Sequence, residues 1–156
     1  MKEKYWIFLG TQGWEYADWR GNFYPDDMPT DWSLSFYNTR FQTVFFPHAT
    51  WKNASDIELK QWLQDTQEGF RFLLEAGLAG DEAQQCEEKF AGRAILATPE
   101  WCDQHLVWLP VQPDLRALAE RVTRQVSLGR PLFLVSREGN LDTLERVGEL
   151  LQIMGY

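Results

Sequence analysis

Hydrophobic residues along the chain form two kinds of pattern, short continuous runs and stripes with helical spacing. Six runs are apolar on consecutive positions, as in parallel strands that are buried on both faces. The predicted strands are residues 6–10, 43–46, 70–76, 93–98, 105–110 and 131–136. Their alternation with helical segments predicts an α/β protein with a mainly parallel sheet.

Capping residues mark the starts of several helical segments. Ser55 with Glu58 has the pattern of a capping box, as has Asp81 with Gln84, and Asn140 is a typical N-cap. The predicted helices cover residues 33–41, 55–65, 81–90, 114–126 and 140–155.

The segment between the fourth and fifth predicted strands, residues 98–104, is short. Parallel neighbours need a crossover connection of about a dozen residues or more, and this segment is too short for a full crossover helix. The two flanking strands are therefore either misassigned, or one of them is antiparallel.

The stretch GTQGWEYADWRGNFYP, residues 10–25, is unusually aromatic for a loop that leaves a strand. It resembles the opening motif of the YecE-like domain of unknown function, G-T-S-G-W-x-Y-x-D-W-x-G-x-F-Y-P, a family with a TIM-barrel fold. Residues 36–46 and 59–76 continue the likeness, which covers roughly residues 6–76. The resemblance implies one domain over residues 1–156, a shortened and divergent TIM-barrel-like fold with about six mainly parallel strands.

Several polar positions of the family pattern are changed in this chain. Phe45 and Pro47 stand where the family has a glutamate and an asparagine, Trp51 stands at a tyrosine, and Glu75 stands at a lysine. Active sites of such barrels lie at the carboxyl ends of the strands, where these positions fall. The resemblance therefore implies a site whose polar groups have been lost or reversed.

The length of the chain sets a second difference from the family. A complete barrel takes about 250 residues, whereas this chain has 156. Six strands leave an open barrel with two edges, which must be covered, blunted or paired. We expect a second copy of the chain to complete the barrel, as a homodimer.

The aromatic stretch has two interpretations. Trp14, Tyr16 and Trp19 would stack on a sugar or a base, with Arg20 holding an anion. Alternatively, the rings pack on one another and plug the barrel mouth, because each buries a large apolar area. The motif is intact while nearby polar positions are not, which favours the second interpretation.

Other candidate positions follow the predicted strands. His48 would act as an acid, a base or an anion clamp, Glu75 lies where a catalytic carboxylate would lie, and Arg137 precedes a helix N-terminus that would hold an anion. Each also has a structural interpretation, as a hydrogen-bonded or solvent-facing side chain. No catalytic residue can be assigned, and the candidate ligand-binding residues are Trp14, Tyr16, Trp19, Arg20, His48, Trp51, Glu75 and Arg137.

The composition of the chain disfavours several classes of binding partner and cofactor. The formal net charge of −8 counts against nucleic acid, because neutralising phosphates needs clustered Lys and Arg. Two histidines, and two cysteines without a CxxC motif, favour neither a metal site nor a disulfide, so no metal or cofactor is expected. Cys86 and Cys102 are predicted to be small buried hydrophobes. The first apolar run is too short for a signal peptide or a membrane span, so we expect a cytoplasmic protein without a membrane partner.

Three classes of function remain. We favour a non-catalytic or degenerate module for small-molecule binding or assembly, whose ligand would be a small molecule or an anion. The alternative is a small-molecule enzyme with a pocket at the carboxyl-end mouth, acting on a phosphate- or sugar-containing substrate. Nucleic-acid processing ranks last.

Overall fold

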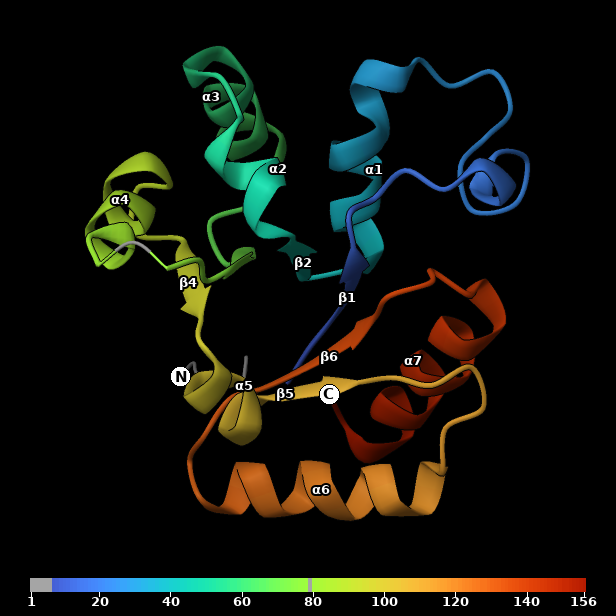
Figure 1. Cartoon of the computed structure of the whole chain (residues 1–156). Helices are drawn as coiled ribbons and strands as arrows, with labels where there is room; N and C mark the ends of the chain where they lie inside the picture. Colours follow the sequence, from blue (N-terminus) through green and yellow to red (C-terminus); the bar gives the residue numbers. More distant parts are fainter. Residues whose placement is uncertain (1–6, 79) are drawn as a thin grey trace.

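Six parallel strands form a single sheet in the computed structural model, which describes residues 7–78 and 80–156 (Figure 1). The order of the strands across the sheet is β4-β3-β2-β1-β6-β5. The strands are β1 (Ile7–Gln12), β2 (Thr43–Phe46), β3 (Arg71–Glu75), β4 (Ala94–Ala97), β5 (Leu106–Trp108) and β6 (Leu132–Ser136). All five neighbouring pairs are parallel, so the alternative of an antiparallel strand was wrong.

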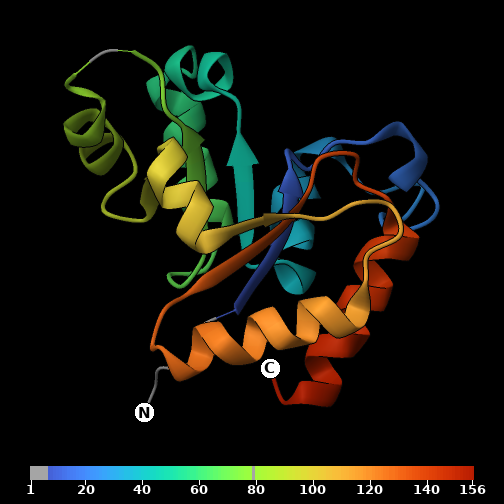
Figure 2. The same ribbon diagram turned by 60° about the horizontal axis from the view of Figure 1, so that its bottom comes forward.

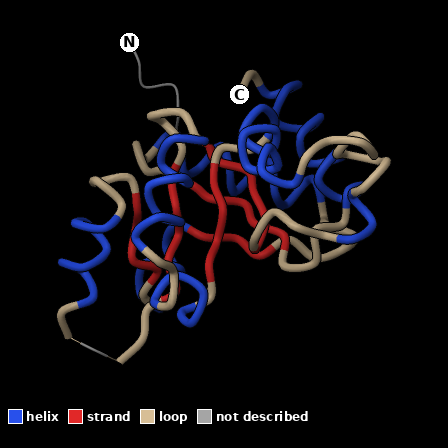
Figure 3. Tube along the Cα trace, turned by 90° about the horizontal axis from the view of Figure 1, so that it is seen from above, coloured by secondary structure: helices blue, strands red, loops and turns tan. Residues whose placement is uncertain are grey.

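Helices fill the connections between the strands and lie around them when the sheet is viewed from above (Figure 3). The α-helices are α1 (Ser33–Arg40), α2 (His48–Lys52), α3 (Asp56–Asp65), α4 (Glu82–Lys89), α5 (Pro99–His105), α6 (Leu115–Ser127) and α7 (Leu141–Met154). Two short 3-10 helices, η1 (Ala17–Trp19) and η2 (Thr30–Trp32), lie between β1 and α1. No helix among the described residues has the length and apolar character that crossing a bilayer would demand.

The strand order is that of a barrel with a section missing. In a complete (β/α)8 barrel the last strand returns to pair with the first, and here β6 pairs with β1 from Ile7↔Leu132 to Thr11↔Ser136. The edges of the sheet are β4 and β5. Strands β5 and β6 therefore take the places of the last two barrel strands, and the opening falls where the fifth and sixth would lie. The predicted fold, an incomplete TIM-like barrel, is confirmed.

Side chains alternate between two faces of the sheet and build two cores. The outer core packs the sheet against the helices and contains Leu9, Val44, Phe46, Phe72 and Leu134. The inner core is smaller, and its buried members are Phe8, Phe45, Leu73, Ala97, Leu106, Phe133 and Val135.

Helix α5 connects the two edge strands of the sheet. It leads from β4 into β5 (Figure 2), starts with Pro99 and is capped by the Thr98 hydroxyl, which accepts from the Trp101 N–H at 3.2 Å. Trp101 and Cys102 pack against the inner core, and the Trp101 ring lies 5.3 Å from that of Phe133. Residues 98–104 are indeed too short for a full crossover helix, but β4 and β5 are the two edges of the sheet rather than neighbours, so no crossover between them is needed. The expectation that a flanking strand is misassigned or antiparallel was wrong.

Two of the three predicted helix starts have the expected caps. Ser55 and Glu58 form the full capping box, and Asn140 accepts from the Thr143 N–H at 3.0 Å. Asp81 does not cap its helix, because its side chain accepts instead from the Gln85 amide at 2.9 Å.

Candidate functional site

The opening aromatic motif is part of the outer core. Trp19 is fully buried, and its ring lies 4.7 Å from that of Tyr16, 5.2 Å from that of Phe23 and 6.2 Å from that of Tyr37. Its indole N–H donates to the carbonyl of Gly139 at 2.7 Å, in the loop between β6 and α7. The motif therefore joins the beginning of the chain to its last helical unit, and it packs outside the barrel rather than in the mouth.

A buried tyrosine fixes the first two strands beneath this cluster. The Tyr37 hydroxyl accepts from the Thr11 N–H at 2.9 Å and donates to the Thr43 carbonyl at 2.7 Å. Complete burial raises the pKa of Tyr37, so the group stays a neutral donor. Helix α1 is thereby hydrogen-bonded to both β1 and β2.

Arg20 and Tyr16 make hydrogen bonds within the fold, and both also line a hollow of about 350 Å³ beside η1 and η2. The Arg20 guanidinium donates to the Met28 carbonyl at 2.8 Å and to the Thr30 hydroxyl at 3.2 Å. The Tyr16 hydroxyl donates to the Gln12 carbonyl, and burial raises the pKa of Tyr16 to about 12.

Trp51 and Glu75 likewise make hydrogen bonds that hold the fold together. Trp51 is fully buried, and its indole N–H donates to the Glu75 carbonyl at 2.9 Å. The Glu75 carboxylate accepts from the His48 backbone N–H at 2.7 Å, at the start of α2. The carboxylate therefore anchors a helix start.

The His48 imidazole is hydrogen-bonded to Glu82 of α4, a residue that is not among the candidates from the sequence. The His48 Nε2 lies 2.5 Å from a Glu82 oxygen, and the other oxygen accepts from the Gly77 N–H at 2.6 Å. Glu82 is 1% exposed. Burial raises the pKa of this carboxyl, but the hydrogen bonds from His48 and Gly77 and the charges of His48 and Lys52 outweigh burial, so the pKa is lowered.

This lowered pKa predicts that acid removes the contribution of Glu82 to stability. A carboxyl with a lowered folded-state pKa stabilises fully above its unfolded pKa, about 4.3 for Glu, and loses that contribution as pH falls through the folded value. We expect Glu82→Gln to cost about 1–3 kcal/mol near neutral pH. In urea titrations, the difference from the unaltered protein should shrink as the pH falls below the ordinary Glu range. A difference that stays constant in acid would contradict the role of the charge.

The inner mouth of the barrel is filled by rings and a guanidinium. Phe45 is 6% exposed, and the Trp108 ring meets it edge-on at 4.9 Å. The Arg137 guanidinium lies 3.9 Å from the centre of the Trp108 ring. Phe45 thus closes the carboxyl end of the inner face, and Arg137 lies over the Trp108 ring.

An aromatic groove lies beside this mouth, at the carboxyl ends of β1 and β2. It is a hollow of about 340 Å³ that Trp14, Phe46, Pro47 and Trp62 line with apolar surface. Trp14 and Trp62 are half-buried and meet edge to face with their centres 5.7 Å apart. We call this hollow the Trp14–Trp62 groove; its remaining lining residues are Gln12, Gly13, Glu15 and Thr50.

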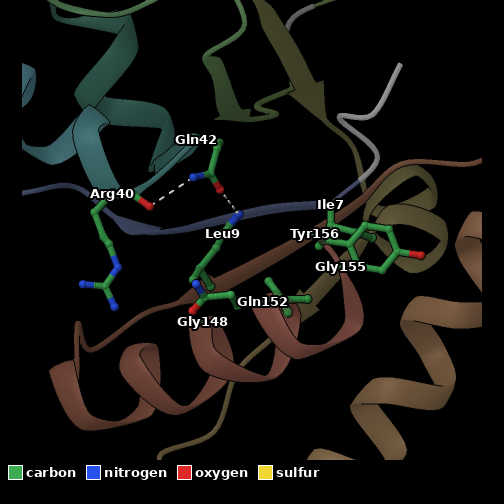
Figure 4. A pocket seen from close by; sticks show the side chains of 9 residues that line it. Ile7, Leu9, Arg40, Gln42, Gly148, Gln152, Gly155 and Tyr156 are labelled. Atoms are coloured by element: carbon green, nitrogen blue, oxygen red, sulfur yellow. Dashed lines mark hydrogen bonds between the residues drawn. The ribbon is translucent and has the colours of Figure 1, made fainter. Parts of the chain in front are cut away.

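A second hollow lies on the opposite end of the sheet and is not part of this site. It has a volume of about 440 Å³ and lies between the end of α1 and α7 (Figure 4). Gln42 crosses it, accepting from the Leu9 N–H at 3.1 Å and donating to the Arg40 carbonyl at 3.0 Å. The amino ends of barrel strands serve stability rather than chemistry.

The structure therefore does not gather the eight candidate residues into one pocket. Trp19 and Trp51 are enclosed, whereas Trp14 lies in the groove, where it meets Trp62. The helical spacing of Leu59, Trp62 and Leu63 predicts only that Trp62 faces the core. In the described ranges, no three His, Cys, Asp or Glu side chains are grouped to hold a metal ion.

The fold and the groove define the class of protein, an incomplete parallel α/β barrel with an aromatic groove beside its filled mouth. Residues 8–88 match the model of the family described as protein of unknown function DUF72. This match spans more than half of the chain, and the chain belongs to that family, which is the YecE-like family that the opening motif predicted.

A solved structure and the curated proteins complete the comparison. The chain is similar to a DUF72 family protein from Thermotoga maritima, with 18% sequence identity and a TM-score of 0.43. The similarity covers 91% of this chain and 62% of that one, so the chain spans less than two thirds of the length of this relative. No curated protein matches the chain.

Proposed function

We propose that this DUF72 chain is a non-catalytic small-molecule-binding module whose site is the Trp14–Trp62 groove. The observation that carries the proposal is a pair of half-exposed indoles around a hollow of about 340 Å³. Ligand pockets are commonly about 300–1,000 Å³, mainly apolar and aromatic, with a few polar groups. The groove fits that description.

The position of the groove supports the same conclusion. Ligands of parallel α/β proteins bind outside the carboxyl ends of the strands, and Gln12 and Phe46 are the last residues of β1 and β2. The inner mouth, where barrel enzymes hold their reactive groups, is occupied by Phe45 and Trp108.

A ligand screen with paired variants tests this function. Small aromatic, sugar and ammonium compounds should include at least one that raises the melting temperature, because a ligand that prefers the folded state stabilises it. Trp62→Leu should abolish that increase, whereas Trp32→Leu, on an exposed side chain outside the groove, should leave it intact. A ligand that binds both variants equally well would contradict the site.

One observation favours an enzyme as the second candidate. The buried Glu82 orients His48, as a carboxylate orients the imidazole of a general base, and the His48 side chain is 37% exposed. An enzyme of this kind would act on a phosphate- or sugar-containing substrate. Turnover of a chromogenic phosphate ester or glycoside that His48→Gln removes would establish it, and equal rates in both proteins would exclude His48.

Assembly as a homodimer is part of the proposal as well. The edge strands β4 and β5 present half-exposed Ile95, Leu96 and Val107, and unpaired edges invite pairing with another chain. Light scattering should give twice the chain mass of 18.3 kDa. A monomer over the accessible concentration range would remove this part and leave the groove unaffected.

A further inference from the structure

Another hollow, distinct from the one between α1 and α7, adjoins the Trp14–Trp62 groove and changes the chemistry of the site. It has a volume of about 360 Å³ and shares Trp14, Glu15 and Trp62 with the groove. The two indoles therefore present surface to both hollows. A ligand that lies against these rings lies beside both sets of lining residues.

The adjoining hollow is acidic. Its lining contains the carboxylates of Glu15, Asp31 and Asp65, of which Glu15 and Asp31 are exposed. An Asp65 oxygen accepts from the Gln61 amide at 2.9 Å, which orients this carboxylate on the surface of α3. Among the described residues that line either hollow there is no Lys, Arg or His. The Arg20 guanidinium donates to the Thr30 hydroxyl of this lining at 3.2 Å, and with three carboxylates the local charge is still net negative, as is the formal charge of −8 of the whole chain.

Indole faces and carboxylates together select one kind of ligand. A cation over an aromatic face is attracted by the ring quadrupole, most strongly for Trp, and quaternary ammonium groups bind proteins in this way. Anions, by contrast, meet three carboxylates at the edge of the same rings. The apolar lining from Phe46 and Pro47 suits the methyl or methylene groups of an organic cation better than a hydrated metal ion.

We infer that the Trp14–Trp62 groove binds a small organic ammonium ion, with the cationic group on the indoles and the carboxylates of Glu15, Asp31 and Asp65 around it. This inference rests on the proposed function of the groove and names the class of its ligand. It differs from the anion expected from the sequence, because the expected anion clamps, Arg20 and Arg137, line neither of these two hollows.

Calorimetric titration with choline chloride tests the inference against a matched neutral compound. The neutral compound is the carbon isostere of choline, in which a tert-butyl group replaces the trimethylammonium group. Choline should bind at least about fivefold more tightly than this isostere at low salt. Added sodium chloride should weaken choline binding, because exposed carboxylates are screened, and should leave binding of the isostere unchanged.

Three variants test which residues contribute to choline binding. Trp62→Leu should weaken choline binding by about fivefold or more, and Glu15→Gln should weaken choline but not the isostere. Glu100→Gln removes an exposed carboxylate of α5, outside both hollows, and should change neither. Because Glu15 is exposed, Glu15→Gln keeps the test valid even if Trp62→Leu lowers the melting temperature.

The outcomes separate the two proposals. Equal binding of choline and its isostere, lost together in Trp62→Leu, would overturn the ammonium inference and support the binding module. If neither compound binds, the ammonium inference is overturned. The ligand screen by melting temperature then decides independently whether the groove binds any small molecule. Binding of a lysine-containing peptide without binding of choline would overturn the small-molecule form of the inference in favour of a protein partner.

Discussion

Trp19→Ala should lower the free energy of unfolding by about 3–5 kcal/mol, the usual cost of truncating a large buried aromatic side chain. Trp19 is 0% exposed, and five aromatic rings lie within 6.2 Å of its own, three from the motif together with Tyr37 and Phe41. It supplies the only donor to the Gly139 carbonyl among the contacts of the described residues. Its loss leaves a cavity and an unsatisfied acceptor at the junction with α7. Urea denaturation measures the effect.

Trp32→Ala is the matched control for this substitution. The Trp32 side chain is 62% exposed in η2, in the same connection of the chain. Its removal should change the unfolding free energy by no more than about 0.5 kcal/mol, as is usual at surface positions. If the two variants lose similar stability, the motif is not the structural junction described above.

Gly10→Ala should destabilise the fold about as much as Trp19→Ala does, and should lower the free energy of unfolding by about 3 kcal/mol or more. A Cβ atom at this position would lie 2.0 Å from the carbonyl oxygen of Thr43 and 2.7 Å from its carbonyl carbon. Both atoms belong to the backbone of β2, which is paired with β1 on one side and β3 on the other. The strand cannot move away without breaking these ladders.

Gly69→Ala is the matched control for Gly10→Ala. A Cβ atom at Gly69 would meet no other heavy atom within 4 Å, and its backbone does not have a positive φ. This variant should retain the stability of the unaltered protein. Thermal unfolding compares the two, and a Gly10→Ala protein that melts at the same temperature as Gly69→Ala would contradict the close approach of β1 to β2.

Continuous apolar runs made the strands predictable from the sequence. The run at residues 43–46 coincides with β2, and the capping box at Ser55 marks the start of α3 correctly. These features depend on neighbouring residues, which is why a sequence is enough to find them. The path across the barrel opening was not predictable in the same way, because the seven residues of α5 are fixed by contacts of Trp101 with the distant Phe133.

The site was less predictable than the fold because burial depends on distant partners. Nothing in the spacing of the opening motif distinguishes the enclosed Trp19 from the half-exposed Trp14. Trp62 follows the apolar stripe of its helix, yet its ring faces the groove as well as the core. Glu82 lies in the first turn of α4, where acidic residues are ordinary, and its partner His48 is 34 positions earlier in the chain.

The solvent accessibility of the individual indoles distinguishes a buried aromatic junction at Trp19 from an open groove at Trp14 and Trp62. In protein labelled with fluorotryptophan, a soluble paramagnetic agent broadens the fluorine NMR signals of rings that solvent can reach, and single Trp→Phe variants assign the signals. We expect broadening at Trp14, Trp32 and Trp62 and none at Trp19 or Trp51. Broadening of the Trp19 signal as strong as that of Trp32, or protection of both Trp14 and Trp62, would contradict the division of this barrel into a buried aromatic junction and an open aromatic groove.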